Sequence, residues 1–323
     1  MSDVKKVIFD TDIGIDDAMA LLFLHYSPQI DLVAIATGFG NASLEDTTRN
    51  ALYVKEKFNI SAPVYAGAST PLAPALLEEY PDFVHGKNGL GDIDIPAVNL
   101  QAETKSAVQA IIDIVKDNPN EISIVAVGRM TNVARAIKKA PEIVGLIKEV
   151  IVMGGVFGYN GHRGNVTPVA EANIIGDPTA ADQLFTSGVP TVIVGLDVTE
   201  EVQMDAAYIK SVCSQAGEAG EFIDAISEYY LDFYQGRVNE RRCPMHDSSA
   251  VAYLLRPDLY TTKEAVVRVV TEGRAIGQTI SGDGLAEYVI DDWYNLPACK
   301  FCTGVDAQGV LDLYAETLAL AAS

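Results

Sequence analysis

Short apolar runs of strand type alternate with longer amphipathic stretches along the chain. An apolar run without alternation is typical of a strand buried on both faces, and an amphipathic stretch is typical of a helix that covers a sheet. This alternation predicts a largely parallel sheet with helices on both faces. The clearest strands are predicted at Val4 to Phe9, Leu32 to Thr37, Ile122 to Val127, Glu149 to Met153 and Thr191 to Val194. Helices are predicted between them at Asp16 to Tyr26, Leu44 to Phe58, Lys105 to Lys116, Asn132 to Lys139 and Pro178 to Thr186.

The later part of the chain adds elements without a visible boundary. No linker rich in proline, glycine or serine and no internal repeat divides the sequence, so residues 1–323 are expected to form one domain. The expected fold class is an open, mostly parallel, Rossmann-like α/β sheet with a small additional C-terminal part, either a sheet edge or a subdomain. That part is predicted from helices at Glu218 to Tyr234 and from about Asp247, and strands at Ala265 to Val270, Arg274 to Ile280 and Glu287 to Trp293.

Acidic residues outnumber basic ones by 44 to 23, which gives a formal charge of -21. Such a field repels nucleic-acid polymers and anionic membranes, but it is compatible with a neutral small molecule or a divalent cation. No secretory signal or membrane-spanning apolar stretch is visible, so a cytoplasmic location is expected. Four cysteines are too few for a disulfide framework, and Cys299 and Cys302 are expected to be structural thiols rather than half of a zinc site.

Four carboxylates are concentrated where the first predicted strand turns into the first predicted helix, at Asp10, Asp12, Asp16 and Asp17. Active sites of open α/β sheets lie at this end of the strands. Like charges a few ångströms apart repel by about 1 kcal/mol per pair even at the dielectric of water. A hard divalent ion reverses that sign, and Ca²⁺ accepts six to eight oxygen ligands. The loop therefore predicts a metal site.

The alternative is that acidic residues near a helix start cap free N–H groups and complement the helix dipole. Capping can account for Asp16 and Asp17. It does not account for Asp10 and Asp12, which directly follow a buried type of strand.

The acidic loop resembles the aspartate cluster that opens the nucleoside hydrolases, the inosine-uridine-preferring family. Further segments resemble landmarks of that family and occur in order over roughly the first 250 residues. They are Gly40-Asn41, His85 to Gly91, Val127 to Asn132, Met153 to Gly155, Gly164 to Pro168, Ala170 to Asn173 and His246-Asp247. The resemblance implies hydrolysis of the N-glycosidic bond of ribonucleosides, as in nucleoside salvage, in a homodimer or homotetramer.

The resemblance also implies the metal ligands. Ca²⁺ would be bound by the carboxylates of Asp12, Asp17 and Asp247 and by the backbone carbonyl of Val127, with Asp10 behind Asp12 and orienting it. Asp12 would also be the general base, taking a proton from a water that the ion activates for attack on the anomeric carbon.

Substrate contacts follow from the same resemblance. Asp16, Asn173 and Asp247 would bind the 2′ and 3′ hydroxyls of the ribose, and Asn165 and Glu171 the 5′ hydroxyl. Asn41 would support the metal or the sugar, and Met153 would contact the sugar face. His246 would assist departure of the base, and His85 would lie near the base.

Two segments keep open interpretations. Tyr229, Tyr230, Phe233 and Tyr234 have helical spacing and are expected to be mostly packing, although one or two could stack on the base. Arg237, Arg241 and Arg242 form either a solvated loop or a lid.

The chain departs from the usual family pattern in several places. Ala172 stands where many relatives have Phe, which leaves the preference for purine or pyrimidine substrates open. Thr11 and Ile13 replace common Cys and Pro, and Arg129-Met130 replaces a common Pro-Leu pair.

Two other functions fit part of the sequence. The segment from Phe9 to Asp12 resembles the nucleophile loop of haloacid dehalogenase-type phosphatases, with Gly176 to Asp182 as a possible metal motif. That reading leaves the later acidic and histidine motifs unused. A catalytically silent, Ca²⁺-dependent ribose-binding protein would need the same ligands, and only turnover would distinguish it from the hydrolase.

Overall fold

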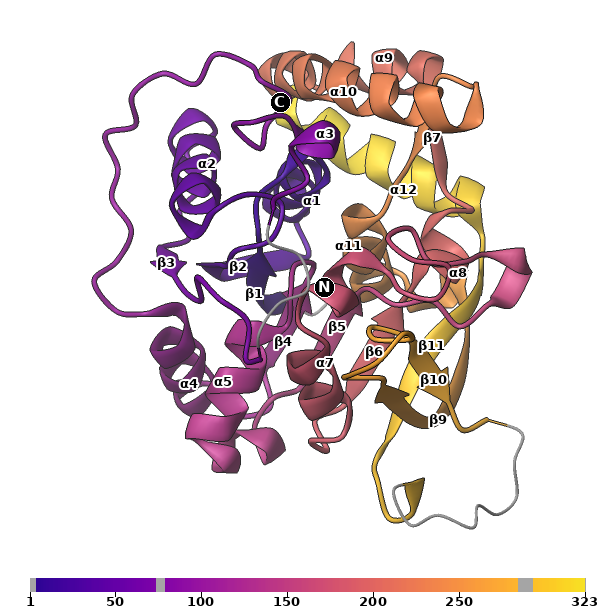
Figure 1. Ribbon diagram of the computed structural model, residues 1–323. Helices are drawn as coiled ribbons and strands as arrows, with labels where there is room; N and C mark the ends of the chain where they lie inside the picture. The colour runs from indigo at the N-terminus through magenta and orange to yellow at the C-terminus, as the bar shows by residue number, and fades with distance from the viewer. Residues whose placement is uncertain (1–3, 74–78, 284–292, 323) are drawn as a thin grey trace.

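The computed structural model describes residues 4–73, 79–283 and 293–322. A nine-stranded sheet crosses it in the order β10–β9–β11–β6–β5–β4–β1–β2–β3 (Figure 1). Neighbours from β11 to β3 pair in parallel, whereas β9 is antiparallel to both β11 and β10. The strands are β1 (Lys5–Thr11), β2 (Ile30–Thr37), β3 (Val64–Ala66), β4 (Ile122–Ala126), β5 (Glu149–Met153), β6 (Thr191–Val194), β9 (Tyr260–Val269), β10 (Thr279–Ser281) and β11 (Ala298–Val305).

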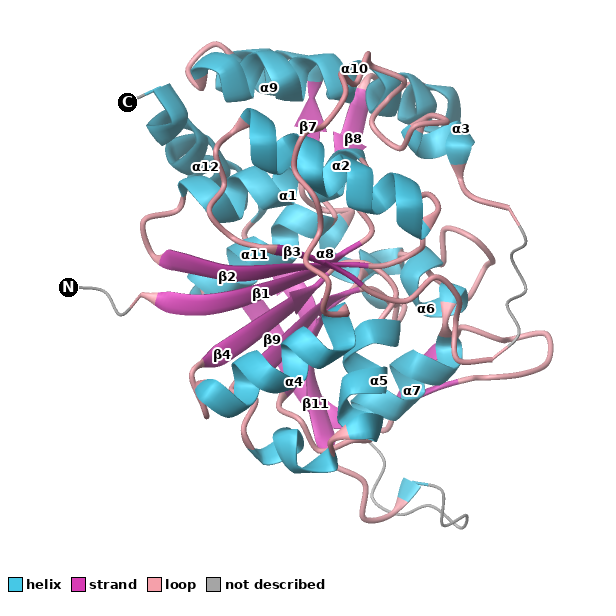
Figure 2. Ribbon diagram, turned by 90° about the vertical axis from the view of Figure 1, so that its left-hand side faces the viewer, coloured by secondary structure: helices cyan, strands magenta, loops and turns pink. Residues whose placement is uncertain are grey.

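Helices cover both faces of the sheet (Figure 2). One face carries α1 (Ile15–Tyr26), α2 (Leu44–Lys57), α9 (Ala206–Cys213), α10 (Gly217–Val238), α11 (Asp247–Leu255) and α12 (Ala307–Leu318). The opposite face carries α4 (Ala107–Asp117), α5 (Thr131–Lys139) and α7 (Pro178–Phe185). Short helices α3 (Asp82–His85), α6 (Ala172–Gly176) and α8 (Leu196–Thr199) lie in loops, and β7 (Gln203–Asp205) pairs with β8 (Arg242–Pro244) outside the main sheet.

Each central strand supplies side chains to two hydrophobic cores. Val7 and Phe9 of β1 pack in one core, and Ile8 between them packs in the other. Successive side chains of a strand point to opposite faces, so burial on both faces requires the continuous apolar runs seen in the sequence. On the first face, every residue of α1 from Ile15 to Leu24 is buried, because α1 packs against the sheet and against α10, α11 and α12.

The structure confirms the predicted fold class and the principal strands and helices, with small shifts at their ends. The C-terminal part is an added sheet edge, formed by β11, β9 and β10. The predicted strand at Arg274 to Ile280 is wrong over most of its length, because Gly273 and Gly277 adopt positive φ angles of 76° and 82° and turn the chain before β10. Of the predicted strand from Glu287 to Trp293, residues 287–292 lie outside the described residues. Strands β3 and β11 and helix α12 were not predicted.

The positions of the cysteines support the expectation that Cys299 and Cys302 are structural thiols. Within the described ranges all four thiols are free. Cys299 and Cys302 are buried in different hydrophobic cores, which places their sulfur atoms on opposite faces of β11. Two thiols so separated do not bind one zinc ion. None of the helices in the described part of the chain is long and apolar enough to cross a membrane.

Replacing Leu21 by alanine tests the packing of α1. Leu21 is fully buried, so Leu21→Ala should lower the free energy of unfolding by about 2–5 kcal/mol, measured from urea denaturation curves. Leu100→Ala is the matched control, because Leu100 is 38% exposed and its loss should cost less than about 0.5 kcal/mol. Equal effects of the two substitutions would contradict the buried position of α1.

Candidate active site

The turn between β1 and α1 is tied together by Asp17. Its Oδ1 accepts hydrogen bonds from the Thr11 hydroxyl and from the backbone N–H of Asp12. Its Oδ2 accepts from the Gly14 N–H at 2.9 Å and from the side-chain amide of Asn41 at 2.8 Å. Asp17 therefore satisfies N–H groups that the start of α1 would otherwise leave unpaired, as the capping alternative predicted. Capping does not account for Asp12, because its carboxylate lies in a different environment.

The carboxylate of Asp12 lies between two glycines from separate loops. A Cβ atom at Gly40 would stand 1.7 Å from its Oδ2, and one at Gly128 would stand 2.6 Å from its Oδ1. Oδ2 accepts a hydrogen bond from the backbone N–H of Asn41 at 2.8 Å. Oδ1 is buried and has no hydrogen-bond partner in the described structure. Because an unpaired buried carboxylate oxygen is costly, this atom is a strong candidate for contact with a cation or with a reacting proton.

Three other carboxylates converge beside this position. Asp16 and Asp17 come from the first turn of α1, and Asp247 is the first residue of α11. One oxygen from each lies within 4.8 Å of the others. Helices distant in sequence thus bring three acidic groups together at the carboxyl end of the sheet, which is the arrangement expected of a metal site.

Burial makes the charged forms of these acids unfavourable. It raises the pKa of Asp16 to about 6. Burial, followed by the charge of Asp17, raises the pKa of Asp12 well above its usual range, and burial, followed by the charge of Asp16, does the same for Asp247. Bringing these carboxylates together therefore has a free-energy cost that a bound divalent cation would reverse.

Asp10 lies within β1 rather than on the turn after it, because β1 continues to Thr11. Burial raises the pKa of Asp10 to about 7. Its Oδ1 accepts a hydrogen bond from Asn132 Nδ2 at 2.8 Å, and Asn132 Oδ1 accepts from the Ala68 N–H at 2.8 Å. Asp10 thus links β1 to the N-terminus of α5 and to the loop after β3.

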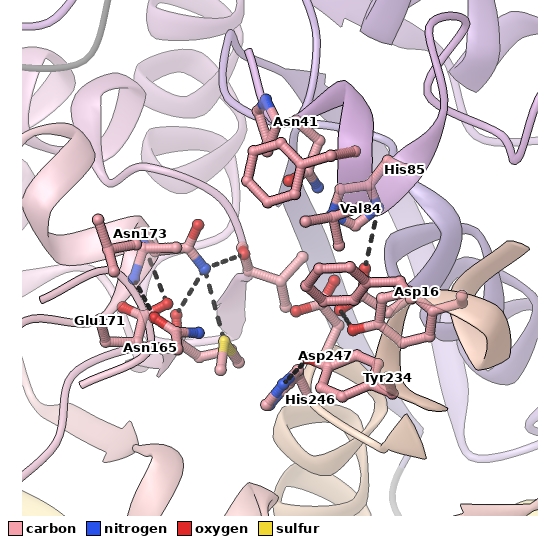
Figure 3. A pocket seen from close by; sticks show the side chains of 18 of the residues that line it. Asp16, Asn41, Val84, His85, Asn165, Glu171, Asn173, Tyr234, His246 and Asp247 are labelled. Atoms are coloured by element: carbon pink, nitrogen blue, oxygen red, sulfur yellow. Dashed lines mark hydrogen bonds and ion pairs between the residues drawn. The ribbon is translucent and has the colours of Figure 1, made fainter. Parts of the chain in front are cut away.

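A pocket of about 260 Å³ opens above the acidic cluster (Figure 3). All eight residues predicted to bind substrate line it, namely Asp16, Asn41, His85, Met153, Asn165, Glu171, Asn173 and Asp247. His246 and Val127 line it as well. Asp17 does not line this pocket, and Asp12 lines a neighbouring cavity.

One end of the pocket is rich in amide and carboxylate groups. Glu171 caps α6, accepting from the Asn173 N–H at 2.9 Å, and its other oxygen accepts from the N–H groups of Gly155 and Ile174. The side-chain amide of Asn173 donates to the carbonyl of Val127 at 2.6 Å, and Asn165 accepts from the Ala172 N–H at 3.0 Å. These bonds fix the polar side chains before any ligand arrives, which favours recognition of a polyhydroxylated group.

The other end of the pocket carries both predicted histidines. His246 Nδ1 is 2.8 Å from the Thr199 hydroxyl and His246 Nε2 is 3.0 Å from the Tyr234 hydroxyl. His85 Nδ1 accepts a hydrogen bond from the Ile15 N–H, so a neutral His85 carries its proton on Nε2. Burial lowers the pKa of His85 to about 4 and that of His246 to about 3. Both rings are therefore neutral at neutral pH.

Aromatic side chains from α3 and α10 form a wall at this end. Phe83, Tyr230, Phe233 and Tyr234 line the pocket, and the Arg237 guanidinium lies 5.0 Å from the centre of the Phe233 ring. Tyr229 instead donates its hydroxyl to the Asp82 carbonyl outside the pocket. Arg241 and Arg242 form ion pairs with nearby acids, so only Arg237 of the basic group reaches the pocket.

Sequence reasoning missed several site residues. Thr199 contacts His246 across the pocket wall, and Phe83 belongs to the aromatic wall. Phe83 could have been proposed from the sequence, because it lies two residues before His85, where a predicted motif begins. Thr199 carried none, since its role depends on α8 and α11 meeting in space.

The chain is similar to known proteins over nearly its full length. The family model described as inosine-uridine preferring nucleoside hydrolase matches residues 7–312. Uridine nucleosidase 1 of Arabidopsis thaliana is 36% identical over 310 residues, covering 95% of this chain and 91% of that protein. The pyrimidine-specific ribonucleoside hydrolase RihB of Escherichia coli (strain SE11) is 37% identical over 277 residues, covering 85% and 87%. A solved purine-preferring ribonucleoside hydrolase from Gardnerella vaginalis aligns with a TM-score of 0.90 at 34% identity, covering 99% of this chain and 100% of that one.

Fold, pocket and sequence similarity together define a ribonucleoside hydrolase. The chain belongs to the inosine-uridine preferring nucleoside hydrolase family. The resemblance stated from the acidic loop and the ordered motifs is thereby confirmed. The similarity does not favour the phosphatase or the silent ribose-binding protein, and the supposed phosphatase metal motif has a structural role, because Asp177 caps α7.

The contact between Gly40 and Asp12 gives a direct test of the geometry. Gly40→Ala should displace the Asp12 carboxylate and lower kcat/KM for nucleoside hydrolysis by about 100-fold, because an added Cβ overlaps Oδ2. Gly145→Ala is the matched control, since nothing lies within 4 Å of a Cβ at that position. Thermal unfolding of both variants would separate misplacement from misfolding. Unchanged hydrolysis by a folded Gly40→Ala protein would contradict a role for Asp12.

Proposed function

We propose that this protein hydrolyses the N-glycosidic bond of ribonucleosides in a Ca²⁺-dependent reaction that yields ribose and a free base. The observation that carries the proposal is the unpaired, buried Oδ1 of Asp12 beside three converging carboxylates and below a polar pocket. Both products are starting materials for nucleoside salvage.

The residues present fit a calcium ion. All the converging donors are oxygen atoms, which Ca²⁺ prefers, and the Oδ1 atoms of Asp12 and Asp16 are buried without a hydrogen-bond partner among the residues that the structure describes. Asp12, Asp17, Asp247 and the carbonyl of Val127 would hold the ion. When bound, Ca²⁺ supplies Lewis-acid chemistry, lowering the pKa of a water molecule.

Asp12 would act as the general base. The backbone N–H of Asn41 holds Oδ2, so Oδ1 is left to accept a proton. Asp10 would orient this region through Asn132 and β1 rather than through a direct contact with substrate.

The ribose would lie between the polar end of the pocket and the acidic cluster. Asp16, Asn173 and Asp247 would bind its 2′ and 3′ hydroxyls, and Asn165 and Glu171 its 5′ hydroxyl. Asn41 would support Asp12 and Asp17, with which it already forms hydrogen bonds, and Met153 would contact the sugar face. A pocket with this many fixed polar groups rejects deoxy analogues, because its own groups are left unpaired.

The histidine end would hold the base. Cleavage leaves negative charge on the departing base, so a proton donor accelerates it. His246 would donate that proton from its protonated form, which burial makes the minor form in the free protein, and the Thr199 and Tyr234 hydroxyls would fix the direction of its ring. His85 and the aromatic wall would contact the base.

Base preference depends on this wall rather than on overall similarity. A relative named for uridine and one named as purine-preferring are similarly close to the chain, at 36% and 34% identity. Uridine and inosine are therefore the first two substrates to compare.

The function is tested by following base release from uridine and inosine. The wild-type protein should release base from at least one of them, and a chelator should abolish this until Ca²⁺ is restored. Asp12→Asn should lower kcat by about 100-fold or more, because it removes a general base and a metal ligand. Asp31→Asn is the control, since Asp31 is exposed. Full activity of a folded, metal-stripped enzyme would disprove the calcium requirement.

The role of His246 is tested by varying the leaving group. His246→Ala should lower kcat/KM for uridine and inosine by about 10²–10⁴-fold, the usual contribution of a general acid. The loss should be much smaller for p-nitrophenyl riboside, whose leaving group needs no proton. Equal losses on all three substrates would show that His246 is structural.

A further inference from the structure

A second cavity of about 490 Å³ adjoins the pocket. The two share Asn41, Pro81, Phe83, Val166, Ala172 and Asn173. The second cavity is lined in addition by Arg129, Asp12 and residues 79–82. The proposed function uses Asp12, Asn41 and Asn173 at one side of this space, but it gives no role to Arg129 or to residues 79–82.

Arg129 is held rigidly in that cavity. Its guanidinium carbon lies 4.5 Å from the centre of the buried Phe39 ring. Its Nε passes so close to Gly176 that a Cβ there would stand 2.2 Å away. Only glycine at position 176 leaves room for this arginine, so the side chain is fixed by packing on both sides.

The guanidinium of Arg129 is attracted to the charge of Asp12 but has no hydrogen-bond partner among the described residues. It forms no hydrogen bond or ion pair with any residue in the part of the chain that the structure describes. A guanidinium carries five N–H donors in a fixed plane. Arg129 therefore presents preorganised, unused donors to the cavity, and such donors bind an acceptor at low entropic cost.

The passage between the two cavities starts beside the proposed 5′ position of the ribose. Asn165 and Glu171, which would bind the 5′ hydroxyl, precede Val166 and Ala172, and both of these line both cavities. Ala172 contributes only a methyl group to the passage. A group attached to the 5′ oxygen can therefore extend from the pocket toward Arg129.

The charges in the second cavity determine which substituents on the 5′ oxygen it can bind. Asp12, Glu79 and Asp82 line it together with Arg129, and the whole chain carries a charge of -21. A phosphate dianion would be repelled by the carboxylates of Glu79 and Asp82, whereas an uncharged carbonyl oxygen can accept from Arg129 without that repulsion.

We infer that the second cavity is a subsite for an uncharged, carbonyl-bearing substituent on the 5′ oxygen, with Arg129 as its hydrogen-bond donor. The inference rests on the proposed function, because it uses the proposed orientation of the ribose. The enzyme would then accept 5′-O-acyl ribonucleosides as well as ribonucleosides with a free 5′ hydroxyl.

The inference is tested with 5′-O-acetyluridine and 5′-O-acetylinosine beside their parent nucleosides and the corresponding 5′-monophosphates. The readout is the ratio of kcat/KM for each 5′-substituted compound to that for its parent. The acetyl compounds should release base, and the monophosphates should be much poorer substrates. Arg129→Met keeps the length of the side chain but removes the donors, and it should lower the acetyl ratio by about tenfold or more.

Two further variants test whether the effect is specific to Arg129 and to the passage between the two cavities. Arg274→Met removes an exposed arginine distant in sequence and should leave the ratio unchanged. Ala172→Phe fills the passage and should lower the acetyl ratio even if Arg129→Met fails to fold.

The outcomes separate the two proposals. No base release from uridine or inosine would reject the proposed function itself. Release from the parents but not from the acetyl compounds would reject the subsite, as would an equal loss on parent and acetyl substrates in Arg129→Met, which would make Arg129 a counter-charge for Asp12. Efficient hydrolysis of the monophosphates would overturn the selection against anions.

Discussion

The repulsion among buried carboxylates is the constraint on which the rest of this structure depends. Asp12 follows β1, Asp16 and Asp17 begin α1, and Asp247 begins α11, so chain segments more than two hundred residues apart meet at one point. Hydrophobic packing holds them there, because α1 and α11 pack against each other and against the sheet. Folding thus concentrates negative charge that the chain alone does not neutralise. The proposed cation follows from that concentration.

Much of the fold could be predicted from the sequence, because strands buried on both faces require continuous apolar runs. β5 and β6 were located to the residue. The strands at the C-terminal edge of the sheet were harder to predict. In β11, lysine and threonine interrupt the apolar residues, and in β10 only three residues pair after two glycine turns. Such strands are stabilised by neighbours that local pattern does not reveal.

The candidate site also has a part that could be predicted from the sequence and a part that could not. Residues within contiguous motifs, such as Asp12 and Asn173, could be proposed from sequence. Contacts made by separate loops could not, including the approach of Gly40 and Gly128 to Asp12 and the position of Arg129 between Phe39 and Gly176. These depend on distances between backbones that no spacing encodes. Arg129 was noticed only as a departure from the common Pro-Leu pair.

Tyr234 contributes both to the aromatic wall of the pocket and to the hydrogen bonding of His246. Its ring is part of the aromatic wall, and its hydroxyl lies 3.0 Å from His246. A substitution here that reshaped the wall for a different base would also remove one of the two hydroxyls that orient the proposed acid. Selectivity and turnover are therefore genetically linked at a single codon, and a lineage that changed its preferred nucleoside through Tyr234 would need a compensating change near His246.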